Sequence, residues 1–373
     1  MTDVIEFCSD LIRCKSVTPD DDGAIECISK FLQKLGFSTE ILTFGSKKRC
    51  IPNLFAKYRG GKGKKLGFLG HSDVVPPGGE WKTDPFNPSV HDGYLIGRGV
   101  ADMKGGIAAF CCAAKKFIQN DFNGELLFFI TGDEEIGSYD GIQSVLNWAN
   151  QNAEIPDDCI LGEPSSYQKL GDRVYAGHRG SINIDVRSHG KQGHVAYPQN
   201  FKNSLMQLCE YIAKIKQYPW KHNDKRFPKT NLEPTLLFSD NYAENVVPEK
   251  SSANLNIRFG GDYSANQLKM ILQNEARIYD IDLNFKVSGE AYYCDDQNLH
   301  NLLAQSIKNI TGLTPEFSAA GGISDARHMI KYCNVIEFGL IDETIHQANE
   351  KVKIEDLYIL EEIYLEFLRN YFR

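Results

Sequence analysis

Residues 125–135 read ELLFFITGDEE, an apolar run that ends in three consecutive carboxylates, Asp133, Glu134 and Glu135. Five of the first six residues are large and apolar, so the run predicts a short strand that is buried in a sheet. Like charges that crowd where a strand ends repel one another, and the crowding needs a chemical reason. The stretch therefore predicts a buried sheet with a carboxylate-using site at the end of one strand.

Composition limits the class of protein. A chain of 373 residues is long for one hydrophobic core, which usually stops growing near ~250 residues, so two domains are expected. The net charge of -8 argues against nucleic acid or an anionic membrane as the main partner. We see no signal peptide and no apolar run near the ~20 residues that span a bilayer. Ten cysteines without a C-x-x-C pair indicate reduced thiols of a cytoplasmic protein.

Strands and helices alternate in the first half of the chain and again at its end. Short apolar strands are expected at about 54–58, 65–70, 125–131 and 158–162, with helices at about 4–12, 25–35, 104–119 and 140–150. After residue 292 we expect a further helix, a strand at 334–341 and a long helix from 353. This alternation predicts an α/β sheet, in which ligands gather beyond the carboxyl ends of the strands.

The region from about 180 to 291 has a different pattern of apolar and polar residues. The stretch SINIDVRS at 181–188 alternates strictly between apolar and polar residues, as a half-buried strand does. A helix at 201–217, strands at 234–239 and 252–259, a helix at 264–278 and a strand at 281–288 are predicted to follow. The order β-α-β-β-α-β is that of a ferredoxin-like α+β unit. We therefore expect a catalytic domain of residues 1–179 and 292–373, interrupted by an inserted domain of residues 180–291.

Residues that can bind a metal gather in five clusters of the predicted α/β part. They read LGHSD at 69–73, GRGVADMKGG at 97–106, TGDEE at 131–135, LGEPSS at 161–166 and TIHQANE at 344–350. Four of the five follow an apolar strand or open a helix, where such a sheet presents its ligands. His71 and Asp73 are two residues apart, so on an extended chain Asp73 could accept one imidazole N–H while the other nitrogen binds a metal.

The clusters offer histidines and carboxylates but no cysteine, a ligand set that suits zinc, or cobalt or manganese in its place. One ion would need fewer carboxylates, so their number predicts two ions ~3.5–4 Å apart, with one carboxylate bridging them. On this hypothesis Glu135 binds metal, and Glu134 beside it accepts a proton from the attacking water. The sequence suggests no role for Asp133.

Each cluster has a simpler reading when it is taken alone. A His-x-Asp pair is most often a surface pair or a cap, DEE is usually a solvated turn, and the Asp of GVADMKGG could cap a helix. A binding protein without catalysis would be expected to have lost Glu134 or a ligand, and an aminopeptidase on a related domain would usually lack the insert. Five clusters in one domain favour the metal site of an enzyme.

In order and spacing the chain resembles the di-zinc aminoacylase and carboxypeptidase family over essentially its whole length. The motifs that carry the resemblance are GHSDVVP, GRGVADMKGG, TGDEE, GEPSS, GHRGS, GKQGHVAYP, NVVPEKSSANLNIRF, GGISDAR and TIHQANE. The resemblance implies a di-zinc, peptidase-like catalytic domain with a mixed sheet flanked by helices. It also implies that the inserted ferredoxin-like domain serves as a lid and forms a homodimer.

The resemblance also implies roles for individual residues. Asp102 would bridge two zinc ions, with His71 and Glu163 completing one site and Glu135 and His346 the other. Asp73 would orient His71, Glu134 would be the general base, and the Asp102–Met103 peptide would be cis. His194 would reach across the dimer to stabilise the oxyanion of the partner's reaction. Residues expected to bind substrate are Arg258, Arg179, Asn245, Tyr197, His178, Gly322, Ile323 and Asp342.

Within the family, GEPSS and GHVAYP favour the branch that removes succinyl groups. The expected reaction is hydrolysis of N-succinyl-LL-2,6-diaminopimelate, a step of lysine and diaminopimelate biosynthesis, to succinate and the free diamine. Four positions depart from that branch: His178 replaces Arg, Ile323 replaces Thr, Asp342 replaces Asn, and Glu244 replaces a neutral residue. Each departure weakens the recognition of a substrate with three carboxylates. The alternative is a deacylase or dipeptidase with a less anionic N-acyl amino acid substrate, such as an acetylornithine deacetylase.

Overall fold

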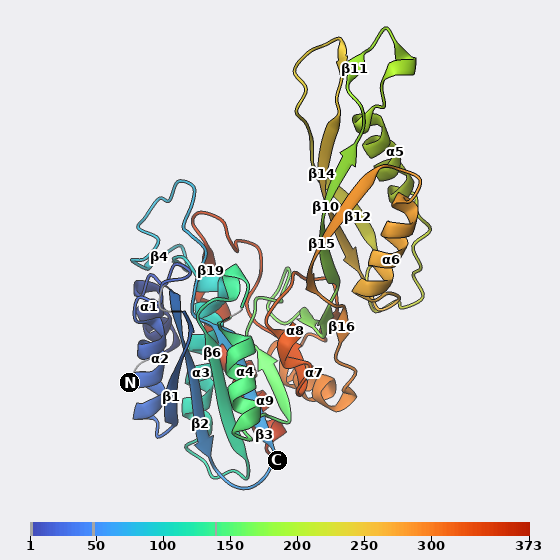
Figure 1. Ribbon diagram of the computed structural model, residues 1–373. Helices are drawn as coiled ribbons and strands as arrows, with labels where there is room; N and C mark the ends of the chain where they lie inside the picture. Colours follow the sequence, from blue (N-terminus) through green and yellow to red (C-terminus); the bar gives the residue numbers. More distant parts are fainter. Residues whose placement is uncertain (1–2, 47–48, 139) are drawn as a thin grey trace. The chain divides into compact units, whose positions relative to one another are not determined.

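The computed structural model describes residues 3–46, 49–138 and 140–373, which form two compact units (Figure 1). Unit 1 is built from the chain up to Ala176, from Cys294–Ser318 and from Ser324–Arg373. Unit 2 is built from Gly177–Tyr293 and from the short segment Ala319–Ile323, which the sequence did not assign to the insert. The chain passes between the units close to the boundaries expected at 179 and 292.

Unit 1 contains an eight-stranded sheet with the order β1-β2-β6-β3-β7-β18-β8-β17. Its strands are β1 Ser38–Ser46, β2 Arg49–Arg59, β3 Lys65–His71, β6 Glu125–Thr131, β7 Asp158–Leu161, β8 Arg173–Tyr175, β17 Glu316–Ser318 and β18 Asn334–Glu337. The neighbours β6, β3, β7 and β18 are parallel, whereas β1, β2 and β6 pair antiparallel. The prediction of a mixed sheet is confirmed, and four of its strands end at one edge.

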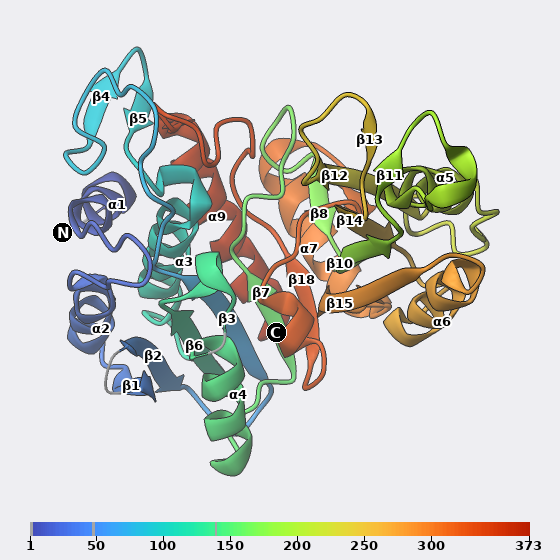
Figure 2. The same cartoon turned by 45° about the horizontal axis from the view of Figure 1, so that its top comes forward.

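Helices cover both faces of this sheet (Figure 2). They are α1 Val4–Arg13, α2 Ala24–Lys34, α3 Gly105–Phe117, α4 Ile142–Gln151, α7 Gln297–Thr311, α8 Ala326–Met329 and α9 Ile354–Tyr371. On one face, Phe68 stacks on Phe110 of α3 at 4.1 Å between ring centroids and meets Tyr364 of α9 edge-on. On the other face, Phe55 packs 5.0 Å from Trp148 of α4. Because both faces are covered, ELLFFI needs no polar alternation.

A small antiparallel sheet stands beside this core. It consists of β4 Ser89–His91, β5 Tyr94–Ile96 and β19 Lys351–Lys353, in the order β19-β5-β4. The tight turn η1 Val100–Lys104 leads into α3, and within it the Asp102–Met103 peptide is cis, as the family resemblance implies.

Unit 2 is an antiparallel sheet in the order β12-β14-β10-β15, packed against two helices. Its elements are β10 Gly180–His189, α5 Ser204–Lys216, β12 Asn231–Ser239, β14 Lys250–Phe259, α6 Ala265–Ala276 and β15 Ile281–Gly289. Along β10, Ile182, Ile184 and Val186 point into the core, so the strict alternation of SINIDVRS reflects one covered face. The predicted ferredoxin-like unit is confirmed.

Short strand pairs complete unit 2. β9 Gly177–His178 pairs with β16 Tyr292–Tyr293, and β11 Gly193–His194 pairs with β13 Val246–Val247. The first pair joins the place where the chain enters unit 2 to the place where it leaves. The second pair forms a two-stranded ribbon beside the four-stranded sheet.

Several strands of unit 1 differ from the expectation. Those that were not predicted are β1, β4, β5, β8, β17 and β19. β18 ends at Glu337 rather than at residue 341. The chain beyond it stays buried, and the carbonyl of Leu340 is satisfied outside the regular ladder by the backbone N–H of Ser166 at 3.1 Å. β1 was not predicted because most of its side chains are exposed and give a weak apolar signal.

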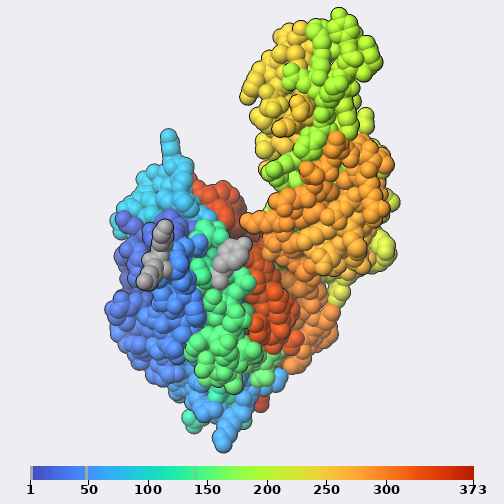
Figure 3. Space-filling view, in the orientation of Figure 1, coloured from blue at the N-terminus to red at the C-terminus, as the bar shows by residue number. Residues whose placement is uncertain are grey.

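Segments that are far apart in the sequence share the surface of unit 1. Figure 3 shows its early part in blue to green beside its last part in red. Among the described helices, none is long and apolar enough to cross a membrane.

Replacing Phe68 with alanine should lower the free energy of unfolding of unit 1 by about 3–5 kcal/mol, because the fully buried ring would leave a cavity between the sheet and two helices. Urea denaturation followed by circular dichroism measures the change. The control is Val90→Ala, whose side chain is 62% exposed and whose transition should stay in place. An F68A transition that coincides with the parent's would contradict this packing of Phe68 between the layers.

Candidate metal centre

Two groups of three side chains meet beyond the carboxyl ends of the parallel strands of unit 1, and they share Asp102. One group is His71, Asp102 and Glu163, and the other is Asp102, Glu135 and His346. Within each group the potential ligand atoms lie within 4.8 Å of one another. Three of the side chains come from the ends of β3, β6 and β7. The fold thus brings together all five residues expected to bind metal.

The carboxylate of Asp102 offers one oxygen to each group. Oδ1 lies 3.0 Å from Nε2 of His71, and Oδ2 lies 3.3 Å from Nε2 of His346. The same nitrogen of His71 is 3.4 Å from Oε1 of Glu163, and that of His346 is 3.2 Å from Oε1 of Glu135. Each imidazole nitrogen therefore faces two carboxylates, and this set of nitrogen and oxygen atoms fits a pair of divalent ions such as zinc.

The ionisable groups shift one another's pKa values strongly. Burial acts to lower the pKa of His71, but the carboxylates of Glu163, Asp102 and Asp73 raise it well above its usual value. Hydrogen bonds with Asp102 and Glu135 raise the pKa of His346 to about 10. Burial, and next the charge of Asp102, raises the pKa of Glu163 to about 8. Divalent cations would displace these protons and balance the crowded carboxylates, which is a second sign that the residues fit metal.

Glu134 belongs to neither group, although it is adjacent to Glu135 in the chain. Burial raises the pKa of its carboxyl well above the usual value, against the opposing charge of His71. The charges of Asp325 and Glu163 raise it further. A carboxyl whose pKa is raised holds a proton more readily than an ordinary glutamate, which suits the general base of a hydrolysis.

Asp73 lies behind His71 and differs in detail from the expectation. The nearest acceptor for Nδ1 of His71 is the backbone carbonyl of Asp73 at 2.9 Å, whereas the carboxylate oxygen is 3.5 Å away. The carboxylate instead accepts the backbone N–H groups of Glu134 and Glu135, both at 3.2 Å. Asp73 therefore orients the imidazole and the doubled glutamates together. Spacing predicted that its carboxylate would contact the imidazole, but neither the carbonyl contact nor the bonds to the glutamates.

Glu350 is a positioning residue that the sequence did not reveal. Its carboxylate and its partner Arg98 are both 1% exposed and lie 2.7 Å apart. It also accepts three backbone N–H groups of the turn that carries Asp102. These donors are Gly99 at 3.0 Å, Ala101 at 2.8 Å and Asp102 at 3.2 Å. Because Glu350 lies four residues after His346, it ties together two segments of the centre. The motif TIHQANE contained this carboxylate, but its burial depends on contacts that sequence spacing does not show.

Asp133 and Asp325 hold the loop that bears the doubled glutamates. Asp133 is buried, accepts the backbone N–H of Asp140 at 3.0 Å and lies 3.6 Å from Arg49. Burial raises the pKa of Asp133 to about 6. Asp325 accepts hydroxyl hydrogen bonds from Thr131 and Ser138, one at each end of the loop. The structure thus gives Asp133 a role in anchoring the loop, for which the sequence suggested none.

The other predicted catalytic and substrate residues lie mostly in unit 2. Nε2 of His194 is 3.4 Å from Nδ2 of Asn245, and its ring is 5.6 Å from that of Tyr197. A second pair, Arg179 and Arg258, is half-buried, and burial lowers the pKa of both guanidinium groups. Among the described residues, neither arginine forms an ion pair with a carboxylate.

The remaining substrate residues have varied surroundings. His178 is buried in β9, with its ring 5.8 Å from that of Tyr292. Gly322 and Ile323 lie in the segment grouped with unit 2. Asp342 lies in unit 1 and forms an ion pair with Arg173, which balances the negative charge that this departure introduces. A contact of these residues with substrate stays a prediction.

Comparisons with known proteins agree with this centre. The sequence matches the model of Peptidase family M20/M25/M40 over residues 67–370. A succinyl-diaminopimelate desuccinylase of Zymomonas mobilis is 39% identical over 99% of this chain and 98% of its own length. Another succinyl-diaminopimelate desuccinylase, from Wolbachia pipientis, is 40% identical over 99% of this chain and 94% of its own length. The fold matches aminopeptidase PepT of Bacillus cereus, with a TM-score of 0.80, 19% identity and coverage of 98% and 97%. It also matches a dinuclear metal binding peptidase of Bacillus subtilis, with a TM-score of 0.72, 14% identity and coverage of 99% of this chain and 97% of that protein. The family resemblance is confirmed, and the chain belongs to peptidase family M20/M25/M40.

Proposed function

We propose that this protein is a metal-dependent amidohydrolase that cleaves N-succinyl-LL-2,6-diaminopimelate to succinate and LL-2,6-diaminopimelate in the cytoplasm. The observation that carries the reaction type is the pair of His–carboxylate groups that share Asp102, with Glu134 beside them and outside both. The substrate is supported by relatives about 39% identical over nearly the full chain, which are succinyl-diaminopimelate desuccinylases.

The cofactor in this proposal is a pair of zinc ions, for which cobalt or manganese could substitute. His71 and Glu163 would hold one ion, Glu135 and His346 the other, and Asp102 both. Bound zinc supplies Lewis acidity toward the amide carbonyl and lowers the pKa of water. The count of two is supported by the Bacillus subtilis protein of the same fold, a dinuclear metal binding peptidase.

Glu134 moves the protons of the reaction. Its carboxylate accepts a proton from the attacking water and then gives that proton to the leaving amine. The raised pKa of this buried group suits the task, because the proton must stay on Glu134 between the two steps. Asp73 keeps Glu134 in place by accepting its backbone N–H at 3.2 Å. His194 donates a hydrogen bond to the developing oxyanion.

Unit 2 serves as the lid and the dimerisation domain in this proposal. β12 is an edge strand, and three of its own residues, Leu236, Leu237 and Phe238, are 53%, 52% and 50% exposed. An exposed apolar edge strand favours pairing with a second sheet. Two copies that pair along β12 would cover this edge, and His194 of one protomer would act in the active site of its partner.

A three-carboxylate substrate is supported by the two guanidinium groups of unit 2. Arg179 and Arg258 are half-buried without a carboxylate partner in the described chain, and an anion beside them would offset their desolvation. Three departures point to the alternative, a deacylase or dipeptidase with a less anionic substrate: His178, Glu244 and Ile323. The fourth, Asp342, carries less weight because Arg173 neutralises it.

Changing Glu134 to glutamine should lower kcat at least ~10²-fold, because the amide cannot accept the proton of water. Zinc content, measured by mass spectrometry of the purified protein, should equal that of the parent because Glu134 is outside both ligand groups. Glu40→Gln, on an exposed position of β1, is the matched control. An E134Q enzyme with normal turnover would refute the assignment of the base, and one that loses zinc would make Glu134 a ligand.

Steady-state kinetics of the zinc-loaded protein should give a higher kcat/KM for N-succinyl-LL-2,6-diaminopimelate than for N-acetylornithine or small dipeptides. Arg258→Met should lower kcat/KM for the succinyl substrate by about ten- to a hundredfold, the size of a lost charged hydrogen bond, and should affect a dipeptide less. No turnover of the succinyl compound, with clear turnover of another amide, would remove the substrate assignment and leave the hydrolytic mechanism.

Leu237→Asp should convert the proposed dimer to monomers in light scattering, because a charge would then be buried in the paired edge. Turnover should fall with the dimer while zinc binding persists in unit 1. Met270→Asp, 57% exposed on α6, is the control and should stay dimeric.

Mixing inactive H194A and E134Q proteins should restore turnover, because one site of a mixed dimer then holds both residues. Activity of a monomeric L237D protein would contradict the role of His194 across the dimer.

A further inference from the structure

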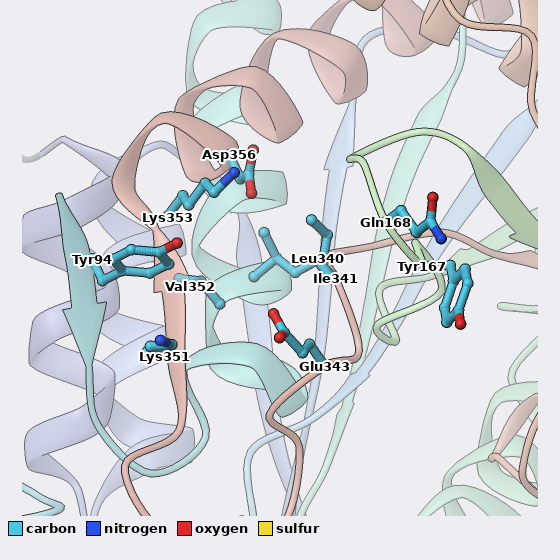
Figure 4. Close-up of a pocket in the computed structure, with 10 residues that line it drawn as sticks. All are labelled: Tyr94, Tyr167, Gln168, Leu340, Ile341, Glu343, Lys351, Val352, Lys353 and Asp356. Carbon is cyan, nitrogen blue, oxygen red and sulfur yellow. The ribbon is translucent and has the colours of Figure 1, made fainter. Parts of the chain in front are cut away.

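Unit 1 contains a cavity of about 410 Å³ that uses none of the residues assigned to the metal centre (Figure 4). Its floor is apolar: Leu340 and Val352 line it and are 1% and 5% exposed. Tyr94 and Tyr167 stand at opposite sides of it. The volume falls within the ~300–1,000 Å³ of small-molecule sites in proteins.

Backbone hydrogen bonds hold the walls of this cavity in place. On one side β19 pairs with β5, so that Lys353 lies opposite Tyr94. On the other side Ser166 bonds through its N–H to Leu340 at 3.1 Å and through its carbonyl to the N–H of Asp342 at 3.0 Å. The hydroxyl of Thr344 donates to the backbone carbonyl of Lys351 at 3.0 Å and accepts the backbone N–H of Lys351 at 3.1 Å. Backbone hydrogen bonds therefore hold the walls in place, and the charged side chains that line the cavity are not required for this.

Those charged side chains are bound by no ion pair within the described chain, although Lys353 is near enough to Asp356 for its charge to oppose the burial that raises the pKa of that carboxyl. Glu343, Lys353 and Asp356 form no ion pair and no side-chain hydrogen bond within the described parts of the chain, while Lys351 lies 4.6 Å from the ring centre of Tyr94. Figure 4 places Lys353 and Asp356 at one end of the cavity and Glu343 apart from them. A cavity with unpaired charges of both signs and an apolar floor complements a molecule that also carries both signs.

We propose that this cavity is a second small-molecule site, separate from the metal centre, and that it takes the zwitterion of an α-amino acid with an extended side chain. The carboxylate of the amino acid lies toward Lys353 and Lys351, and its ammonium group lies toward Glu343. The side chain lies along Leu340 and Ile341, where its methylene groups leave water.

The site is placed to act on the metal centre from within unit 1. Glu343 is three residues before His346, and Tyr167 is four residues after Glu163. An occupant therefore contacts the two segments that supply one histidine and one carboxylate to the centre. Binding of the amino acid is independent of the proposed reaction, and an effect on turnover would be a consequence of these shared segments.

Isothermal titration calorimetry of the zinc-loaded, full-length protein tests the proposal, with L-lysine and L-norleucine as probes and cadaverine as the probe without a carboxylate. The two amino acids should bind once per chain, and cadaverine should not. Lys353→Met and Glu343→Gln should each weaken binding roughly tenfold or more, as expected for the loss of a charged contact. Their melting temperatures and turnover without added amino acid should match the parent's.

Two control variants distinguish binding in this cavity from binding elsewhere on the protein. Lys229→Met removes an exposed lysine of unit 2 and should leave binding unchanged. Arg258→Met tests binding at the proposed substrate residues and should also leave it unchanged. Binding that survives both K353M and E343Q, or that is lost only in R258M, would overturn the proposal. So would the absence of saturable heat with either amino acid at millimolar concentration. Because no turnover is measured in these titrations, the result stands whether or not the proposed reaction is correct.

Discussion

The site in unit 1 is organised around one carboxylate, that of Asp102, which two imidazole groups share. Gathering three carboxylates and two histidines costs free energy, and a chain would not collect them without a framework that over-determines their positions. Parallel strands provide this framework because their ends meet at one edge of a sheet whose apolar faces supply the stability. Asp102 itself comes from a turn, and its backbone is fixed by the buried carboxylate of Glu350. The position of Asp102 thus depends on a buried ion pair, Arg98–Glu350, that belongs to neither group of metal-capable side chains.

Features that depend on local pattern could be predicted from the sequence. The run ELLFFI and the alternation of SINIDVRS gave the right strand type, because burial on two faces or on one leaves a direct mark on residue order. Four of the five residues expected to bind metal could be found because each stands next to such a strand or helix, whereas His346 was found from its motif. The roles of Glu350 and Asp325 could not be predicted, because a carboxylate in a loop is expected to face solvent unless its neighbours in the fold are known. For the same reason, the carbonyl of Asp73 could not be recognised as the nearest acceptor for His71.

The chemistry divides between the units in an instructive way. Among the described residues, unit 1 supplies both groups of side chains that could hold a metal ion, together with Glu134. Unit 2 holds the guanidinium groups and His194, which suit recognition of an anion and of developing charge. Under the proposed function, substrate preference could change mostly through unit 2, because three of the four departures from the desuccinylase pattern, His178, Glu244 and Ile323, lie there and only Asp342 lies in unit 1.

The pairing of β9 with β16 has a consequence for how such a chain can arise. At the junction, the backbone N–H of Cys294 donates to the carbonyl of Ala176 at 2.7 Å, so the chain leaves and re-enters unit 1 through neighbouring residues. A whole domain inserted there closes a long loop whose ends already touch, and unit 1 need not stretch to accept it. A short turn could join the same two points. The insert is therefore modular at this junction: apart from the contacts that group Ala319–Ile323 with it, unit 1 could gain, lose or exchange it without a change in the strands that carry the metal-capable residues.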